Sequence, residues 1–296
     1  MASLNPNVKN LRLDFCGRIT DEAIVHWASH LDCLKRVELL GPFLVRVSGW
    51  LKFLEQRASQ LEGFLITQTP RFNEECIESL VKHAPGLTGL RLSRVGQLND
   101  DWVPHLIRFS NLTSLDLSYT SASLTDQSVV ELLEAIGSNL ALLNLSGNEE
   151  LTDATLLDGI LPNTKSLASL SLADLPIMTD QGFAELFNNW DSNPALEYLD
   201  VSRNHLPESA AFQAILKHSG TALLELLLNG WKGIPNDVLL KLGERAPKLV
   251  KVDFGFCRGV DNFVIKGLLD SCEKLQEIKC YGCNHVTIDC PRKVRV

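Results

Sequence analysis

Leucines recur along the chain in the order L-x-x-L-x-L, at a spacing of 25 to 29 residues. The clearest copies are LTSLDL from Leu112, LALLNL from Leu140, LASLSL from Leu167 and LEYLDV from Leu196. Weaker copies, which raise the number to eleven, start at Val8, Leu34, Leu61, Leu87, Leu223, Leu249 and Leu275. Because apolar and polar positions alternate in each copy, the pattern predicts eleven short strands with one buried face.

The copy that starts at Leu140 shows which side chains we expect inside. Leu140, Leu143 and Leu145 fall on one side of the strand and are predicted to point into the core. Leu142 and Asn144 lie between them and are predicted to point outward. The outward residues of successive strands would then line one open face.

An asparagine follows the strand in two copies, at Asn148 and Asn204. We expect this side chain to point inward and to satisfy backbone groups of the turn that would otherwise be buried and unpaired. The same position is held by three cysteines, Cys16, Cys257 and Cys283. A cysteine there acts as a small hydrophobe with a weak donor.

Six pairs of polar residues predict helix starts after the strands: Thr20-Asp21, Asn99-Asp100, Thr125-Asp126, Thr152-Asp153, Thr179-Asp180 and Asn236-Asp237. Such residues cap helices by accepting hydrogen bonds from free backbone amides. The apolar spacing after one pair predicts a helix from Asp126 to Ile136. Helices are expected to end near His83, Arg245 and Ser271. Each copy is therefore expected to form a strand, a turn and a capped helix.

This period and strand motif are typical of leucine-rich repeats. The sequence predicts an α/β solenoid of about eleven repeats, shaped as a horseshoe or arc, with a parallel sheet on the concave face and helices on the convex face. We expect one domain over residues 1–296. The first strand begins near Val8 without a cap, and residues 281–296 are too few for another helix and cap. We therefore expect a fragment of a longer protein that lacks its N-terminal region.

Composition narrows the classes of partner. The formal charge is −8, and the only basic cluster is Arg292, Lys293 and Arg295 near the end of the chain. Tight nucleic-acid binding needs a basic face, so contact with DNA is expected only through other proteins. No apolar stretch reaches the roughly 18 residues of a membrane span, and no secretory signal is present. An intracellular protein without a membrane partner is expected.

The C-terminal cysteines resemble a zinc site, because Cys280, Cys283, His285 and Cys290 follow a C-x2-C spacing with further ligands. The repeat argues against this interpretation, since Cys280 holds a strand leucine position and Cys283 the asparagine position. Both are predicted to lie in the core, and the eight cysteines are predicted to be free thiols. No hydrolase, dinucleotide or phosphate-loop motif is present. We therefore expect no metal, no cofactor and no enzymatic activity.

The outward strand positions are the natural binding surface of a solenoid. Aromatic residues beside arginine and aspartate suit a protein partner. The candidate partner-binding residues on this face are Arg12, Arg36, Arg91, Asp116, Tyr198, Leu227 and Tyr281. The alternative is a solvated sheet face with scattered apolar residues. A dense apolar turn, residues 39–50, is a second candidate, either as a docking ridge or as an irregular packed turn.

The chain as a whole resembles the cysteine-containing leucine-rich repeats of F-box proteins, in its strand motif, its Cys/Asn position and its Thr-Asp helix starts. A narrower resemblance is to the Rad-seven type of DNA-repair protein from fungi. It is carried by Gly41-Pro42-Phe43-Leu44-Val45 with Trp50, by Val95-Gly96-Gln97-Leu98-Asn99-Asp100, and by Tyr281-Gly282-Cys283-Asn284-His285-Val286-Thr287.

The narrower resemblance implies a nuclear, non-catalytic subunit of global-genome nucleotide excision repair. It implies a Snf2-type ATPase with a RING finger as a partner, together with a cullin, an elongin-C-like or Skp-like adaptor, and a ubiquitylation substrate. The adaptor is expected to bind the region before the repeats. The alternative is the substrate-receptor repeat of an F-box ubiquitin ligase or a mitosis-exit regulator unrelated to DNA repair.

Overall fold

The computed structural model describes residues 5–15, 17–120, 124–204 and 209–287. Cys16, His205, Cys290 and the basic cluster at Arg292, Lys293 and Arg295 lie outside the described residues. The chain forms two compact units, residues 1–148 and 149–296, called unit 1 and unit 2 below. A single domain over residues 1–296 stays a prediction.

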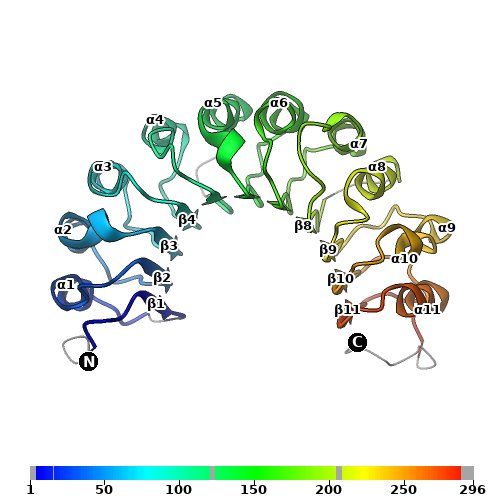
Figure 1. Ribbon diagram of the computed structural model, residues 1–296, viewed down its shortest axis with the longest axis horizontal. Coiled ribbons are helices and arrows are strands. Elements are labelled where there is room, and N and C mark those ends of the chain that lie inside the picture. The colour runs from blue at the N-terminus through cyan, green and yellow to red at the C-terminus, as the bar shows by residue number, and fades with distance from the viewer. Residues whose placement is uncertain (1–4, 16, 121–123, 205–208, 288–296) are drawn as a thin grey trace. The chain divides into compact units, whose positions relative to one another are not determined.

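Unit 1 contains parallel strands paired in chain order. They are β1 (Asn10–Leu13), β2 (Arg36–Leu40), β3 (Gly63–Thr67), β4 (Gly89–Ser93), β5 (Ser114–Asp116) and β6 (Leu142–Asn144). Its helical segments are α1 (Asp21–His30), α2 (Val47–Arg57), η2 (Ala58–Gln60), α3 (Glu74–His83), η3 (Asp100–Trp102), α4 (Val103–Leu106), α5 (Asp126–Ile136) and η4 (Gly137–Asn139). The helices cover one side of the strands and leave the other side open (Figure 1).

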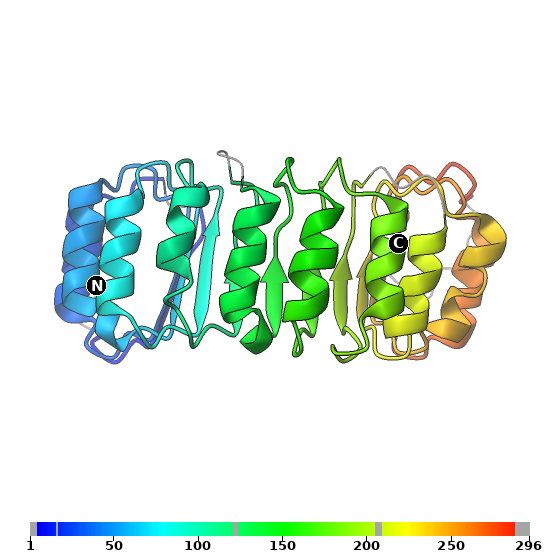
Figure 2. The same ribbon diagram turned by 90° about the horizontal axis from the view of Figure 1, so that it is seen from above.

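Unit 2 repeats this arrangement. Its strands are β7 (Ser169–Ser171), β8 (Tyr198–Asp200), β9 (Glu225–Leu227), β10 (Lys251–Asp253) and β11 (Glu277–Lys279), and they pair in parallel in chain order. Its helical segments are η5 (Thr155–Ile160, a π-helical turn), α6 (Leu161–Asn163), α7 (Asp180–Asn189), α8 (Ala210–Ser219), α9 (Asn236–Leu239), α10 (Leu242–Arg245) and α11 (Asn262–Ser271). Figure 2 shows the helices of each unit standing side by side.

The strand leucines form the core, as the alternating pattern predicts. Leu140 and Leu145 are fully buried and Leu143 is 1% exposed. Helix α5 has the predicted bounds, and α3, α10 and α11 end at the predicted residues His83, Arg245 and Ser271. The α/β leucine-rich repeat fold is therefore confirmed.

The helix starts agree with the Thr-Asp pattern at some repeats and differ at others. Thr125 and Thr179 each accept a hydrogen bond from the backbone amide three residues later, which is the predicted capping role. The cap predicted at Asn236 is wrong, because Pro235 is the N-cap and Asn236 is the first helical residue. Its amide instead donates to the carbonyl of Gly259 in the next repeat.

Every strand is followed by a residue with left-handed backbone, five positions after the strand begins. Four of the eleven are glycines and seven are not. In most repeats the amide of this residue donates to a carbonyl of the next repeat, as Phe256 does to Tyr281 at 2.8 Å. These hydrogen bonds between repeats therefore require the left-handed conformation, which costs a residue other than glycine about 1–2 kcal/mol. These residues form a row just after the ends of the strands, at positions called the strand exits below.

No helix in the described ranges combines the length and the apolar character that a membrane crossing requires.

Candidate interaction surfaces

The strand face of unit 1 carries a chain of ion pairs. Arg91 contacts Glu38 at 3.0 Å on one side and Asp116 at 2.9 Å on the other. Arg12 lies 3.9 Å from the same Glu38 carboxylate. These residues come from β1, β2, β4 and β5. They are therefore far apart in the sequence but close together on the sheet. Three of the seven predicted partner-binding residues are thereby brought together.

Asp116 is more internal than the outward strand position predicts, because it is only 8% exposed. Its carboxylate accepts hydrogen bonds from the backbone amide and hydroxyl of Ser118. The last residues of β8 and β10, Asp200 and Asp253, likewise accept a hydrogen bond from the backbone amide two residues later. Asp116 therefore closes the end of its strand, and its contact with a partner stays a prediction.

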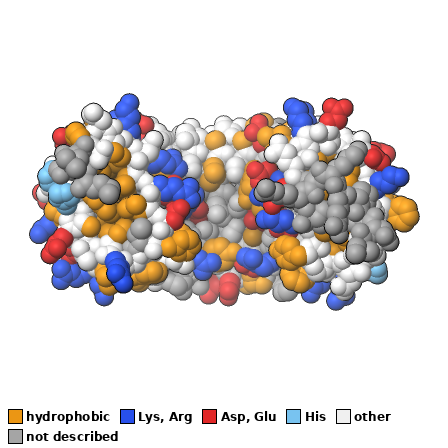
Figure 3. Space-filling model, turned by 90° about the horizontal axis from the view of Figure 1, so that it is seen from below, with side chains coloured by type: hydrophobic (Ala, Val, Ile, Leu, Met, Phe, Trp, Pro, Cys, Tyr) orange, Lys and Arg blue, Asp and Glu red, His pale blue; other side chains and the backbone are white. Residues whose placement is uncertain are grey.

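Arg36 differs from the other two arginines. It is exposed, and a Cβ on Gly63 would lie 3.0 Å from its side-chain Cγ, so the arginine lies across the glycine of the neighbouring strand. Among the described residues its guanidinium makes no ion pair. Positive and negative side chains are visible beside one another on the strand faces in Figure 3.

The other three predicted residues belong to unit 2, where Tyr198 and Leu227 lie on the strand face and Tyr281 lies two residues after the end of β11. Tyr198 and Leu227 are half-buried and Tyr281 is 52% exposed. Burial, together with the charge of Asp200, raises the pKa of Tyr198 to about 12. Tyr198 is thus a neutral hydroxyl at physiological pH, suited to hydrogen bonding rather than charge pairing.

Burial also raises the pKa of the Asp200 carboxyl. Hydrogen bonds from Ser202 and the charge of Arg203 oppose this rise, and the charge of Asp253 adds to it. The two aspartates lie at equivalent strand positions of β8 and β10. Unit 2 therefore places weakly solvated acids beneath its strand face.

The inward asparagine predicted at the strand exits is confirmed. Asn148 is 1% exposed, and its amide donates to the carbonyls of Leu117 and Leu145 at 3.0 and 2.7 Å. Asn204 makes the equivalent pair of bonds to Leu172 and Val201. Each asparagine thus joins its own repeat to the preceding one.

The aspartates of the Thr-Asp pairs have a role that the sequence pattern did not reveal. Asp100 accepts hydrogen bonds from the amide and hydroxyl of Thr125, which is the helix cap of the next repeat. Asp153 does the same to Thr179, at 2.8 and 2.6 Å. The acid therefore connects neighbouring helix caps. The sequence signal that could have indicated this bond is the interval of about 26 residues between the aspartate of one Thr-Asp pair and the threonine of the next.

Cys280 and Cys283 lie in the core, as predicted, with 8% and 6% exposure. The thiol of Cys283 donates to the carbonyl of Phe254 at 3.1 Å. Burial raises the pKa of Cys283 to about 11, so the thiol is protonated at neutral pH, whereas zinc binds the thiolate. Six of the cysteines are free thiols in the structure, and the absence of zinc stays a prediction.

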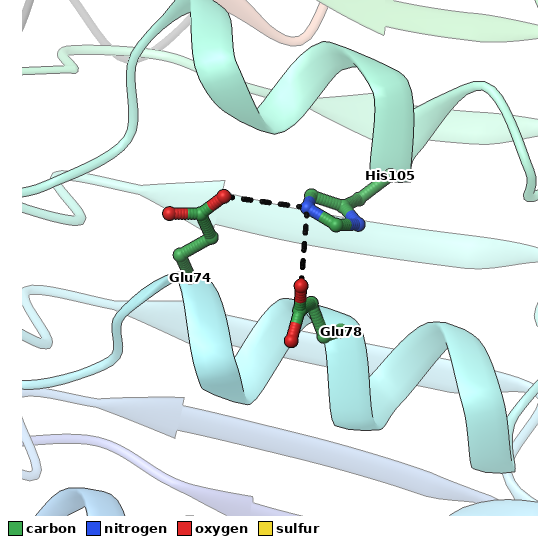
Figure 4. Close-up of side chains that lie close together, drawn as sticks. All are labelled: Glu74, Glu78 and His105. Atoms are coloured by element: carbon green, nitrogen blue, oxygen red, sulfur yellow. Dashed lines mark ion pairs between the residues drawn. The ribbon is translucent and has the colours of Figure 1, made fainter.

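Among the described residues, one cluster of side chains has metal-ligating chemistry. Glu74 and Glu78 lie on one face of α3, and His105 of α4 points between them (Figure 4). The His105 Nε2 atom is 3.5 Å from Glu74 and 3.8 Å from Glu78. The glutamates are more than half exposed, which is typical of a solvated ion pair between helices. The cluster connects α3 to α4 and is outside the strand face.

The apolar turn at residues 39–50 divides into two parts. Val45 and Trp50 are each 1% exposed, so they belong to the core. Phe43 and Leu44 are 46% and 47% exposed. The turn is packed at its base, and these two large apolar side chains are exposed enough to serve the predicted docking ridge.

The repeats, their register and their buried asparagines define the chain as a leucine-rich repeat protein. No protein-family model matches it. The chain is 32% identical over 287 residues to the DNA repair protein rhp7 of Schizosaccharomyces pombe, covering 97% of this chain and 51% of that protein. It is 29% identical over 294 residues to the DNA repair protein RAD7 of Saccharomyces cerevisiae, covering 97% and 52%.

A solved structure agrees with these relatives. The fold matches Rad7 in the crystal structure of the yeast Rad7 and Elc1 complex, with a TM-score of 0.85 and 26% identity, covering 99% of this chain and 74% of that one. The chain is homologous to the Rad7 and Rhp7 DNA repair proteins. It spans about half the length of the two curated relatives.

Proposed function

We propose that this chain is a non-catalytic interaction scaffold in a nucleotide excision repair and cullin ubiquitin-ligase complex that recognises DNA damage across the genome. The observation that carries the proposal is the homology to two DNA repair proteins over 97% of the chain. A repeat sheet with one open face supplies the binding surface that such a scaffold needs. On the same ground we propose that the protein acts in the nucleus.

An elongin-C-like adaptor is the first partner that we propose. Its support is the solved relative, which is Rad7 in complex with Elc1. A Snf2-type ATPase with a RING finger, a cullin and a ubiquitylation substrate complete the proposed assembly. The DNA-repair names of the relatives favour this assembly over the F-box or mitosis-exit alternative.

We propose that protein partners contact the strand faces, through the exposed or half-buried candidates Arg12, Arg36, Arg91, Tyr198, Leu227 and Tyr281. The formal charge of −8 supports indirect rather than direct contact with DNA. Arg36 is the one of the three candidate arginines that makes no ion pair among the described residues, so its charge is available to a partner.

Co-purification tests the assembly. The full-length protein is tagged at its chromosomal locus in the fungal host and recovered with its partners before and after ultraviolet irradiation. We expect a Snf2-type ATPase with a RING finger, a cullin and an elongin-C-like adaptor. Recovery of a Skp-like adaptor alone would support the F-box alternative, and absence of both the ATPase and the cullin would overturn the proposal.

A further inference from the structure

Two aromatic side chains at the strand exits of unit 2 lie outside the core and contact each other. Phe256 holds the left-handed position of its repeat and is 53% exposed, although four repeats place glycine there without strain. Its ring stands edge-on to Tyr281, with the ring centroids 5.3 Å apart. Tyr281 is 52% exposed. Two large rings thus remain in solvent, and one of them, Phe256, holds a position where glycine would fit better.

The aromatic pair is held in place although it is exposed. The Phe256 ring covers Gly282, where any side chain would collide with it. The hydroxyl of Tyr281 accepts a hydrogen bond from the amide of Asn229. Rings that are fixed before binding lose little conformational entropy when a partner arrives, which is the property of interface anchors.

A cavity of about 500 Å³ lies beside the pair and includes Phe256, Lys232 and Gly230 in its lining. Its far wall is an ion pair, in which the Nε atom of Arg203 lies 2.7 Å from Asp174. The glycine in the lining leaves room for one large side chain of a ligand.

Positive charge flanks the aromatic pair. Lys232 and Arg258 are exposed and hold equivalent positions in two successive turns, each seven residues after its strand begins. In the portion of the chain that the structure describes, neither side chain makes an ion pair or a hydrogen bond. By contrast, Lys251 on the nearby strand face is paired with Glu225 at 3.2 Å. Uncompensated cations are thus gathered beside exposed rings on a chain whose net charge is −8.

We propose that Lys232, Phe256, Arg258 and Tyr281, called the rim patch, bind an extended acidic peptide segment of a partner protein. A large apolar or aromatic residue of the peptide enters the cavity against Phe256, and flanking Asp or Glu side chains pair with Lys232 and Arg258. Charge complementarity favours a peptide over nucleic acid, because two free cations neutralise only two phosphates and Asp174 stands at the cavity wall. The inference holds whether or not the chain acts in DNA repair.

Peptide selection tests the proposal directly. A display library of random 12-residue peptides is selected on the full-length protein, and the enriched peptides are measured by fluorescence anisotropy. We expect an acidic consensus with one aromatic or large aliphatic residue. An enriched set without acidic bias, or tighter binding of a 15-nucleotide single-stranded DNA than of the best peptide, overturns the proposal.

Two variants separate binding from folding. Phe256→Gly removes the ring and relieves the left-handed strain, so we expect an equal or higher melting temperature and at least tenfold weaker peptide binding. The pair Lys232→Glu and Arg258→Glu should weaken binding at least tenfold, and a peptide with Lys in place of its acids should regain affinity for this variant. Unchanged binding by either variant contradicts the proposed site.

The matched control reverses two exposed lysines of the same unit away from the strand exits, Lys241→Glu at the N-cap of α10 with Lys266→Glu on α11. This control changes net charge by the same amount as the rim-patch double variant. Its peptide affinity should stay within twofold of wild type at physiological salt. An equal loss in the control would show a general charge effect and would also overturn the proposal.

Discussion

In unit 1 Arg12 and Arg91 of the strand face contact acidic side chains, whereas in unit 2 the exposed cations Lys232 and Arg258 at the strand exits make no ion pair among the described residues. Arg91 joins Glu38 to Asp116 across several strands of unit 1. In unit 2 the exposed cations Lys232 and Arg258 accompany aromatic rings instead. The same repeat scaffold thus supports an internally satisfied network in one unit and an unsatisfied surface in the other. Exposure of charge alone is therefore a poor guide to a binding site.

The largest expected effect comes from the buried asparagine that both units contain. Asn148→Ala in unit 1 should lower the free energy of unfolding by about 1–3 kcal/mol, because it leaves two buried carbonyls without donors. Asn204→Ala should fall at the upper end of that range, since Asn204 also accepts from the backbone amide of Leu175, whereas Asn148 accepts from the side-chain hydroxyl of Thr120. Urea unfolding of both variants gives the comparison. Wild-type stability in either variant would show that the inward asparagine does not support that unit.

A close approach between repeats gives the second effect. A Cβ on Gly182 would collide with the Asp153 carboxylate that binds the cap of α7. Gly182→Ala should therefore cost about 1–2 kcal/mol. Thermal unfolding measures this, with Gly86→Ala as control, because open space surrounds Gly86. If combining Gly182→Ala with Asp153→Ala costs as much as the sum of the single changes, the proposed collision is wrong.

The ion pairs allow a direct contrast between the strand faces. Arg91→Met keeps the aliphatic stem but leaves Glu38 and Asp116 without their cation, and should cost about 1 kcal/mol. Lys251→Met removes a single, more exposed pair with Glu225 and should cost less than about 0.5 kcal/mol. Chemical denaturation at low and high salt measures the loss of unfolding free energy in each variant and ranks the two losses. Equal costs would remove the distinction between a network and an isolated pair.

The smallest expected effect is on the pH dependence of stability, which should have opposite signs for an aspartate of unit 1 and an aspartate of unit 2. Burial alone would raise the pKa of Asp100, but hydrogen bonds from Ser128 and from the amide and hydroxyl of Thr125 lower it below the ordinary 3.8. Its stabilising contribution is present above pH 3.8 and is lost as pH falls through the lower folded pKa. Asp200 has a raised pKa, so its contribution is present at low pH and is lost as pH rises above 3.8 through the folded pKa.

Unfolding free energies between pH 2 and 6 test these signs, a range set to span the ordinary aspartate pKa of roughly 4. With Asp100→Asn the loss of stability relative to wild type should grow as pH rises. With Asp200→Asn the variant should improve relative to wild type over the same range. Slopes of the same sign for the two variants would contradict the assigned environments.

The repetitive elements were predictable because their signals lie within single repeats. The leucine spacing located the strands, and the register placed Asn148 and Cys283 in the core. The hydrogen bond that the Thr179 amide donates to Asp153 was not predicted, because it depends on contact between consecutive repeats and on the glycine at position 182. Sequence spacing alone does not reveal such contacts.

The candidate surface was less predictable than the fold. Alternation along β5 places Asp116 outward, but hydrogen bonds to Ser118 and the Arg91 ion pair hold it in a buried position. The aromatic residue Phe256 was missed because it lies after the strand, where a left-handed residue turns its side chain toward solvent. Seven such positions lack glycine, so the usual sequence signal of this conformation is absent there.

The central claim, a repair scaffold for damage recognition across the genome, is tested most directly by strand-specific repair in cells. The gene encoding this chain is deleted in the organism that carries it, and removal of ultraviolet photoproducts is measured separately on the transcribed and non-transcribed strands of an active gene. We predict slow removal from the non-transcribed strand and normal removal from the transcribed strand, restored by the intact gene. Wild-type removal rates on both strands would contradict the account.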